Sequence, residues 1–168
     1  MRFPGPAPGI PLEQQPEGVV LRCLLCGEAR GEQDAGGTLE AVAMLAILWV
    51  LDARHARERW ARMSLKEIAL QPWQFSCFNA NDPNRARLLD LWKDDPTSWE
   101  RADTICDLFE RGLTLPPVRR ATHYCTKALW GRAPKNPGTP QWFEAPEIAA
   151  GRTRKVAEWG SHVFAEAA

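Results

Sequence analysis

Apolar residues recur at three- and four-residue steps from Glu17 onward, which is the spacing of one buried helical face. The repeating positions are Val19, Val20, Cys23, Leu24 and Cys26. Gly27 and Gly31 follow closely, and glycine is common at helix ends. The pattern therefore predicts a first helix whose last turn, or the position just beyond it, holds Glu28.

A second helix is predicted from about Thr38, a residue suited to cap a helix, to about Arg62. Between Leu39 and Val50 almost every side chain is apolar, so this half of the helix should lie in the core. From Asp52 onward the pattern becomes charged and amphipathic, which is typical of a helix with one face in solvent.

Four further helices are predicted from shorter patterns and from their start and stop residues. They run from Leu65 to Leu70 after Ser64, from Asp82-Pro83 to about Trp92, from Thr97 or Ser98 to Gly112, and over about Arg152–Phe164. The final third of the chain is otherwise rich in loops, because it carries six prolines between positions 116 and 146. The whole pattern predicts a fold of the mainly α or α+β class with a small hairpin.

Length and composition fit one compact domain. The chain has 168 residues, of which 45% are hydrophobic and 25% are charged, as is usual for a globular protein. Residues 1–16 hold five prolines and two glycines, so we expect a proline-rich N-terminal arm that stays extended. Residues 17–168 are then expected to form a single catalytic domain.

Charge is balanced overall but segregated locally. The formal net charge is zero, which argues against a protein held on nucleic acid by its overall charge. The stretch from 111 to 135 nevertheless contains only basic residues among its charged ones: Arg111, Arg119, Arg120, Lys127, Arg132 and Lys135. A solvated face balanced by acids elsewhere and a surface that faces a polyanion both explain this stretch.

The five cysteines are odd in number and lack the spacing of a disulfide framework, which favours free thiols in a reducing compartment. Cys23 and Cys26 share one helical face, and together with Cys125, His123 or His162 they offer a candidate zinc site. Because a second pair at finger or ribbon spacing is missing, buried apolar thiols are the favoured interpretation, and no metal is expected.

The N-terminus lacks the apolar core of a secretion signal, and the longest apolar run, Ala41–Leu51, has eleven residues. Such a run is too short to span a bilayer, so no stable membrane insertion is expected. We therefore expect a protein that stays in the cytoplasm until another factor permeabilises the membrane.

Glu28 is the first candidate for chemistry. Acid catalysis of glycoside cleavage needs a carboxyl group that is protonated near neutral pH. Burial beside Leu24, Leu25 and the apolar helix would favour the uncharged form, although a lone glutamate at a helix end is usually solvated. Glu32, four residues on, either supports Glu28, pairs with Arg30 or caps the next helix.

Residues 71–76 place an amide and a hydroxyl between aromatic rings, a combination that sugar-binding sites use. The candidates there are Gln74, Phe75 and Ser76. A loop that is merely anchored by its aromatic residues is the alternative. Trp142 lies in a predicted loop, where it could stack on a sugar or pack inside the protein. His123 and Tyr124 could orient a sugar, hold a loop or, for His123, bind a metal.

Five short motifs, taken in order, resemble the spore-cortex-lytic type of cell-wall hydrolase, a family also found among phage lysins. They are Glu-Ala-Arg-Gly-Glu at 28–32 before the long apolar helix, Gln-Phe-Ser at 74–76, His-Tyr at 123–124, the loop residue Trp142, and Gly-Ser-His-Val-Phe at 160–164. The resemblance covers residues 19–165. The chain departs from the family pattern at 51–54, where Leu-Asp-Ala-Arg replaces an Asn-Arg pair, and at Ala165, where an aromatic residue is frequent.

The resemblance implies a lysozyme-like or lytic-transglycosylase-like helical domain with a small β-hairpin at the cleft. It makes Glu28 the catalytic acid. It places substrate binding at Glu32, Gln74, Phe75, Ser76, His123, Tyr124 and Trp142. The implied partner is the glycan strand of peptidoglycan, bound by a monomer without a cofactor, a metal or nucleic acid.

On this basis we expect a lytic transglycosylase of phage or prophage endolysin type, which cleaves between N-acetylmuramic acid and N-acetylglucosamine. Because only Glu32 and Asp52 offer a second carboxylate, this outcome is preferred to muramidase-type hydrolysis of the same bond. Two other classes stay open. One is a non-enzymatic nucleic-acid or regulatory binding protein that uses residues 111–135, and the other is a zinc-dependent amidase or peptidase.

Overall fold

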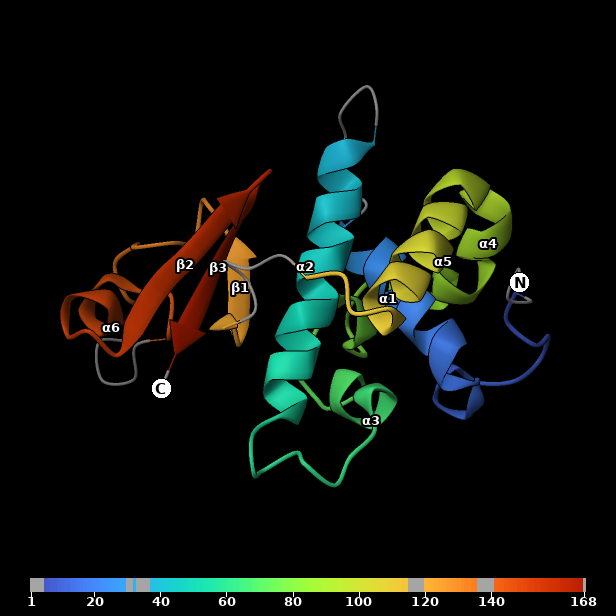
Figure 1. Ribbon diagram of the computed structural model, residues 1–168, viewed down its shortest axis with the longest axis horizontal. Coiled ribbons are helices and arrows are strands. Elements are labelled where there is room, and N and C mark those ends of the chain that lie inside the picture. The colour runs from blue at the N-terminus through green and yellow to red at the C-terminus, as the bar shows by residue number, and fades with distance from the viewer. Residues whose placement is uncertain (1–4, 30–31, 33–36, 115–119, 136–140, 168) are drawn as a thin grey trace.

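The fold is mixed α+β, as the pattern predicted. The computed structural model describes residues 5–29, 32, 37–114, 120–135 and 141–167. Figure 1 shows helices gathered on one side of the long helix α2 (Thr38–His55) and a small sheet on its other side. Among the described residues, no helix combines the length and the apolar character needed to cross a membrane.

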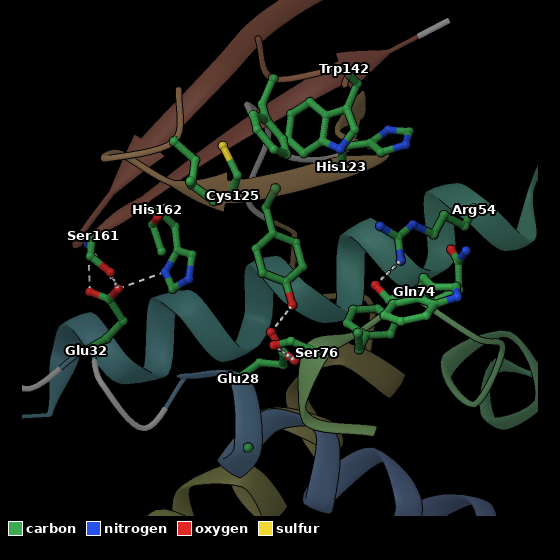
Figure 2. A pocket seen from close by; sticks show the side chains of 17 residues that line it. Glu28, Glu32, Arg54, Gln74, Ser76, His123, Cys125, Trp142, Ser161 and His162 are labelled. Carbon is green, nitrogen blue, oxygen red and sulfur yellow. Dashed lines mark hydrogen bonds and ion pairs between the residues drawn. The ribbon is translucent and has the colours of Figure 1, made fainter. Parts of the chain in front are cut away.

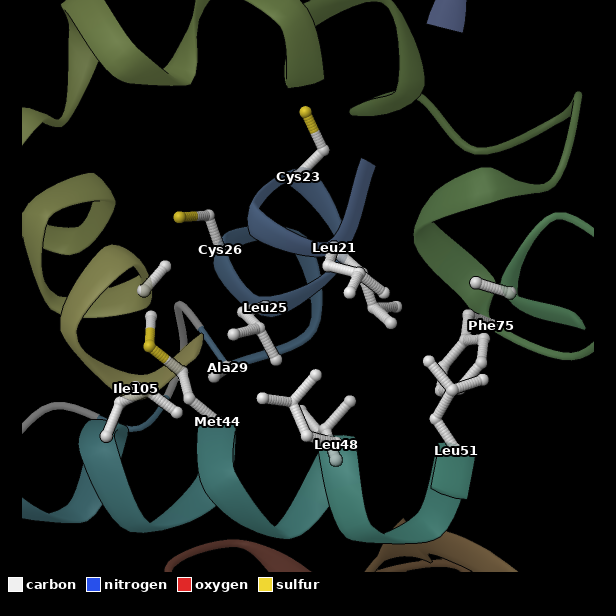
Figure 3. Packing of buried hydrophobic residues seen from close by; sticks show 14 of the residues in the cluster. Leu21, Cys23, Leu25, Cys26, Ala29, Met44, Leu48, Leu51, Phe75 and Ile105 are labelled. Carbon is white, nitrogen blue, oxygen red and sulfur yellow. The ribbon is translucent and has the colours of Figure 1, made fainter. Parts of the chain in front are cut away.

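Helix α1 (Glu17–Ala29) begins where the periodicity predicts, and Glu28 lies in its last turn. Almost all of its side chains are buried, because α2, α3 (Leu65–Ala69) and α5 (Pro96–Glu110) pack around it. Figure 3 shows Leu25 of α1 facing Leu48 of α2 in this core. The early residues of the chain therefore form the centre of the molecule.

The N-termini of α3 and α5 are each capped by a polar side chain. Ser64 and Glu67 form a reciprocal capping box at the start of α3, so the prediction of a helix after Ser64 is confirmed. Helix α5 starts slightly earlier than predicted, because Asp95 and not Thr97 or Ser98 is its cap. The Asp95 carboxylate accepts a hydrogen bond of 3.2 Å from the Ser98 N–H, and Pro96 occupies the first helical position.

The predicted helix over 38–62 is too long, since α2 ends at His55. Beyond that residue the backbone forms tight turns, in which the N–H of Trp60 donates to the carbonyl of Arg57 three positions back. The apolar face of α2 ends near Leu51, so a longer helix would have had little surface to bury. The expected cap is also wrong, because Gly37 takes the position before the helix with φ of 67° and Thr38 is already helical.

The segment after Asp82-Pro83 differs from the single helix predicted there. It forms a 3-10 helix, η3 (Arg85–Asp90), followed by a single turn of α-helix, α4 (Leu91–Asp94). The Asp82 carboxylate accepts a hydrogen bond of 2.8 Å from the Asn84 N–H, which holds these residues in a turn. The buried side chains Leu88 and Leu91 are three residues apart, as suits the tighter helix.

The helix predicted over Arg152–Phe164 is wrong, because this segment is a β-hairpin. Strands β1 (His123–Thr126), β2 (Thr153–Trp159) and β3 (His162–Ala167) form an antiparallel sheet in the order β1-β3-β2. Gly160 opens the two-residue loop between β2 and β3 with φ of 52°, a conformation that glycine adopts at little cost. The short helix α6 (Ala145–Ala149) precedes β2.

The two faces of the sheet pack against different parts of the chain. Tyr124 and Phe164 face each other across β1 and β3 and belong to the main core around α2. Cys125 and Val163, one position along, pack with Phe143 in a small second cluster. The sheet is therefore held on one side by the helices and on the other by residues 129–130 and 142–143.

The described part of the proline-rich arm, residues 5–16, lies against the domain. Gln15 is completely buried, and its side-chain amide exchanges hydrogen bonds of 2.9 Å with the backbone N–H and carbonyl of Ala7. A short 3-10 helix, η1 (Leu12–Gln14), joins the arm to α1. The hydrogen bonds of Gln15 with Ala7 close the arm on itself, whereas Leu12 of the arm is buried in the main core and Lys66 Nζ donates to the carbonyl of Gln15 at 2.7 Å.

Leu48→Ala should lower the free energy of unfolding by about 2–5 kcal/mol, because Leu48 is fully buried between α1 and α2. Leu39→Ala, on the same helix but with 39% of the residue exposed, is the matched control and should cost no more than about 0.5 kcal/mol. Urea unfolding of both variants checks this. Equal losses would show that the face of α2 has been assigned incorrectly.

Candidate active site

A cavity of about 630 Å³ lies where the end of α1, the segment 73–76 and the sheet meet. All eight residues singled out from the sequence line it: Glu28, Glu32, Gln74, Phe75, Ser76, His123, Tyr124 and Trp142. Figure 2 shows Glu28 between Gln74 on one side and Glu32 on the other, with His123 of the sheet and the neighbouring Trp142 opposite. Segments that are far apart in the sequence thus contribute to one hollow.

The half-buried Glu28 carboxylate is held by three hydrogen-bond donors from two other segments. Its Oε1 accepts hydrogen bonds from the Ser76 hydroxyl at 2.9 Å and from the Cys77 N–H at 2.8 Å. Its Oε2 accepts a hydrogen bond from the Tyr124 hydroxyl at 2.6 Å. These donors fix the direction of the carboxylate while leaving it open to the cavity.

A glycine makes this contact possible. Gly27 lies directly before Glu28, and a Cβ atom on it would be only 2.8 Å from Cβ of Cys77. The 3-10 helix η2 (Ser76–Phe78) can therefore approach α1 closely enough for the Cys77 N–H to reach the Glu28 carboxylate. The glycine at this position serves close packing as well as the end of the helix.

Two of the three donors to Glu28 are hydroxyl groups, which can either donate or accept a hydrogen bond. The Ser76 side chain borders the cavity and is exposed, so its hydroxyl can turn. An ionised Glu28 receives hydrogen bonds from both hydroxyls, and a protonated Glu28 can instead donate to one of them. The site is therefore compatible with both protonation states of Glu28.

The Tyr124 hydroxyl keeps its proton at neutral pH. Burial raises the pKa of its phenol well above the ordinary value, and the negative charge of Glu28 raises it further. Its ring also lies 6.1 Å from the Phe75 ring and 5.5 Å from the His162 ring, measured between centroids. Tyr124 consequently links the carboxylate to the aromatic wall of the cavity.

Arg54 is a site residue that the sequence pattern did not indicate. It lies in the last turn of α2 and is 5% exposed, and its Nε donates to the carbonyl of Thr122 at 2.8 Å. Its Nη1 donates to the carbonyl of Gln74 at 3.3 Å, and its guanidinium carbon lies 4.8 Å from the centre of the Phe75 ring. Arg54 thus ties the segment around Gln74 to the start of β1.

Burial lowers the pKa of Arg54 to about 10, and the neighbouring acids Tyr124 and Glu28 oppose this shift. The guanidinium therefore remains charged at neutral pH and contributes positive potential near Glu28. A signal was present in the sequence, because Ile47, Val50 and Arg54 recur at three- and four-residue steps on one helix. A lone arginine on a buried helical face is a candidate for such a role.

Glu32 holds the hairpin turn, whereas Arg30, the ion-pair partner considered from the sequence, lies outside the described residues. The Glu32 carboxylate accepts hydrogen bonds from the N–H of Ser161, at 2.9 and 3.0 Å, and from its hydroxyl. Nδ1 of His162 lies 2.7 Å from Oε1 of Glu32. The ring N–H is not aligned with the oxygen, so this contact is an ion pair when His162 is protonated and not a hydrogen bond.

These contacts keep Glu32 ionised. Burial pushes the pKa of its carboxyl upward, but the hydrogen bonds from Ser161 and the charge of His162 outweigh burial and leave the pKa below 4.5. Gly160 is required beside them, because the Glu32 carboxylate occupies the space that a Cβ atom at position 160 would need. Glu32 therefore positions the β2–β3 turn at the edge of the cavity.

His123 forms part of the aromatic wall. Its ring centroid lies 5.0 Å from that of Trp142, and its Nδ1 lies 2.9 Å from the Thr122 hydroxyl. Burial lowers the pKa of His123 to about 4, and the positive charges of Arg54 and Arg57 add to the shift. The imidazole is therefore neutral at physiological pH and offers an uncharged polar edge beside an indole.

The cysteines do not form the candidate zinc site in the described structure. In the described structure none of the five forms a disulfide and all are buried, and burial raises the pKa of Cys23 to about 12. The Cys23 thiol points to the carbonyl of Leu88, at 3.4 Å, and Cys125 lies in the second cluster against the sheet. Within the described ranges, no three His, Cys, Asp or Glu side chains are grouped to hold a metal ion.

Much of the basic stretch is paired with acidic side chains. Arg120 lies 3.6 Å from Glu166, and Lys127 lies 2.9 Å from Glu158. Arg132 lies 3.5 Å from the buried Glu144, whereas Arg119 is outside the described residues. These ion pairs agree with the simpler interpretation of the stretch, a solvated face balanced by acids elsewhere.

Comparisons with family models, with curated proteins and with solved structures found no match for this chain. The residues of the cavity themselves define the chemistry that is available there. The cavity combines one accessible carboxylate, reversible hydroxyl partners, a nearby buried cation and an aromatic wall. Such a set can deliver a proton to a ligand that presents both apolar faces and hydroxyl or amide groups.

Glu32→Gln should lower the free energy of unfolding by about 1–3 kcal/mol at neutral pH, because an amide group cannot accept every hydrogen bond that Ser161 donates. Since the folded pKa of Glu32 is depressed, its contribution is fully present above about pH 4.5. The contribution is lost as the pH falls through the lower folded value.

Urea unfolding of wild type and Glu32→Gln at a series of pH values measures this difference, which should shrink in acid. Glu110→Gln, at the exposed end of α5, is the control and should match wild type throughout. A difference that stays constant with pH would show that the charge of Glu32 does not stabilise the fold.

Proposed function

We propose that the protein is a lytic transglycosylase that cleaves peptidoglycan glycan strands between N-acetylmuramic acid and N-acetylglucosamine. One observation carries the proposal: the half-buried Glu28 carboxylate opens into an aromatic-walled cavity and keeps hydroxyl partners on both oxygens. The cavity lies within the range of about 300–1,000 Å³ usual for sites that bind small molecules. The resemblance of the motifs at 28–32, 74–76 and 160–164 supports the same substrate.

In the first step, protonated Glu28 gives its proton to the glycosidic oxygen, and the bond from this oxygen to C1 of the muramic residue breaks. The positive charge that develops at C1 and the ring oxygen is the oxocarbenium-like state of glycoside cleavage. Ser76, the Cys77 N–H and Tyr124 then stabilise the ionised Glu28, because all three donate hydrogen bonds to it.

In the second step, ionised Glu28 removes the proton from the C6 hydroxyl of the same muramic residue. The freed oxygen attacks C1 and closes a 1,6-anhydro ring, so Glu28 recovers the proton that it gave away. The buried Arg54 stays charged throughout and favours the carboxylate between the steps. The cycle requires one carboxylate and no water as a reactant.

The position of Glu32 supports this outcome over hydrolysis. Glu28 and Glu32 are the two carboxylates among the described residues that line the cavity, and Asp52 does not line it. Glu32 is committed to Ser161 and His162, so it is a poor base for a water molecule and a poor nucleophile. A hydrolase of the usual kind needs a free second carboxylate at a defined separation.

We also propose that the domain has a lysozyme-like fold. A buried core helix, a glutamate at the end of the preceding helix and a small antiparallel sheet across the cavity are the parts expected of a lysozyme-like domain. We place the protein among endolysins, which act on the cell wall after the membrane has been permeabilised. The resemblance to phage lysins supports this placement.

Glu28→Gln should slow the release of soluble fragments from purified sacculi by about 10²–10⁴-fold, because glutamine keeps an acceptor for Ser76 and Cys77 but cannot donate a proton as an acid. Glu110→Gln, which alters an exposed glutamate at another helix end, should retain the wild-type rate. Melting temperatures establish that both variants are folded. Equal release by wild type and Glu28→Gln would remove Glu28 from the mechanism.

The products should carry 1,6-anhydro-muramic ends, since the C6 hydroxyl replaces water in the second step. Mass spectrometry of digested sacculi distinguishes these ends from reducing muramic ends, which are heavier by one water molecule. Borohydride treatment provides the internal control, because it reduces a free muramic end and leaves an anhydro end unchanged. Reducing ends as the main product would mean muramidase-type hydrolysis.

A further inference from the structure

A second cavity, of about 510 Å³, shares a wall with the main one. Trp73 lines both cavities. Residues 74–76 line the main cavity with it, and residues 79–81 line the second cavity with it. The catalytic scheme above uses neither this cavity nor Trp73. A glycan strand that extends out of the main cavity past Trp73 would meet the second cavity next.

Trp73 is unusual both in exposure and in backbone conformation. It is 77% exposed, the largest exposure among the large hydrophobic residues of the described chain that stand out from the surface. Its φ is 66°, the one positive value among the described residues other than glycine. A bulky residue in this region costs free energy, and such strain is concentrated at ligand-binding positions.

The backbone of Trp73 is held in place from the second cavity. Its N–H donates a hydrogen bond of 3.2 Å to the side chain of Asn79, which lines that cavity. The indole therefore projects from a fixed backbone into solvent instead of folding back onto the core. An exposed aromatic ring on a fixed backbone presents a flat face at small entropic cost.

The rest of the second cavity has the chemistry of a sugar site. Pro72 and Phe78 supply apolar surface, and Asn79 and Asn81 supply amide groups that can donate and accept hydrogen bonds. Arg85 closes the cavity and is itself held by the carbonyl of Phe78 and by the carboxylate of Glu13 in the arm. Aromatic faces combined with amides suit N-acetylated pyranose rings.

We propose that the second cavity binds further sugar units of the same glycan strand, with Trp73 as the platform between them and the units over Glu28. The occupant is the N-acetylhexosamine chain itself, because Trp73 borders both cavities and offers one aromatic face between them. This inference rests on the proposed function for its ligand class. It adds that affinity depends on strand length and that Trp73 confers this dependence.

The test measures binding of N-acetylglucosamine oligomers, from the disaccharide to the hexasaccharide, by calorimetry in the Glu28→Gln background, which prevents turnover. In that background, affinity should rise with length until both cavities are filled. Adding Trp73→Gly should weaken binding of the longest oligomer by about tenfold and leave the disaccharide unaffected. Trp73→Phe, which keeps a smaller flat ring, should restore part of the loss.

Stability separates this role from a structural one. Glycine suits a φ of 66°, so Trp73→Gly should melt at a temperature no lower than its parent while binding long oligomers less well. Trp92→Ala, at a partly exposed tryptophan that lines neither cavity, is the matched control and should leave the length dependence intact.

Affinity that is independent of length, or equal for Trp73→Gly and its parent at every length, would overturn the proposal, and so would the absence of binding. If Trp73→Gly bound a muramyl peptide more weakly than its parent but bound the oligomers equally well, the proposal would also be overturned, since the occupant would then be a peptide stem. These outcomes are separate from those for Glu28. Loss of cleavage in Glu28→Gln with no effect of Trp73→Gly leaves the proposed function standing and removes this inference alone.

Discussion

The hydrogen bonds to the Glu28 carboxylate are the constraint on which the rest of the structure depends. They join three separate parts of the chain, since Glu28 ends α1, Ser76 and Cys77 begin η2, and Tyr124 belongs to β1. A partly buried carboxylate without donors would destabilise the fold, and each unsatisfied group costs about 1–3 kcal/mol. The helices and the sheet therefore have to meet at the place where the acid lies. The same contacts that make the carboxylate tolerable in the folded protein also aim it into the cavity.

Two glycines allow the two carboxylates of the 28–32 motif to hold different segments. Gly27 lets η2 approach α1, because a side chain there would collide with Cys77. Gly160 turns the β2–β3 hairpin with a positive φ and leaves room for the carboxylate of Glu32. Glu28 thereby fixes the floor of the cavity, and Glu32 fixes its edge. The two acids therefore have different roles although they are close in sequence. Glu28 faces the cavity with hydroxyl partners that can donate or accept, and Glu32 accepts its hydrogen bonds from the β2–β3 turn.

Sequence reasoning predicted what depends on local chemistry and failed where distant contacts decide. The periodicity of α1 and the helix start at Ser64 depend on local chemistry, and both predictions are confirmed. The segment 152–164 was predicted as a helix, but β2 within it pairs with β3, and β3 pairs in turn with β1, more than thirty residues earlier in the chain. The eight candidate residues were found through motif order and not through periodicity. Arg54 was missed although it recurs on the buried face of α2, because its partners are backbone carbonyls, which no side-chain pattern identifies.

The short strand β1 shows how one register serves both halves of the site. It is an edge strand, paired with β3 alone among the described strands, and all four of its residues line the cavity. Alternate side chains of a strand point to opposite faces, so Tyr124 reaches Glu28 while its neighbour His123 packs beside Trp142. A slip of one residue would exchange these faces, remove the donor from the acid and bury the histidine beneath the sheet. The antiparallel pairing of Tyr124 with Phe164, both seated in the main core, prevents such a slip. Packing of the sheet on α2 therefore sets the position of the phenol, and through it the direction of the carboxylate.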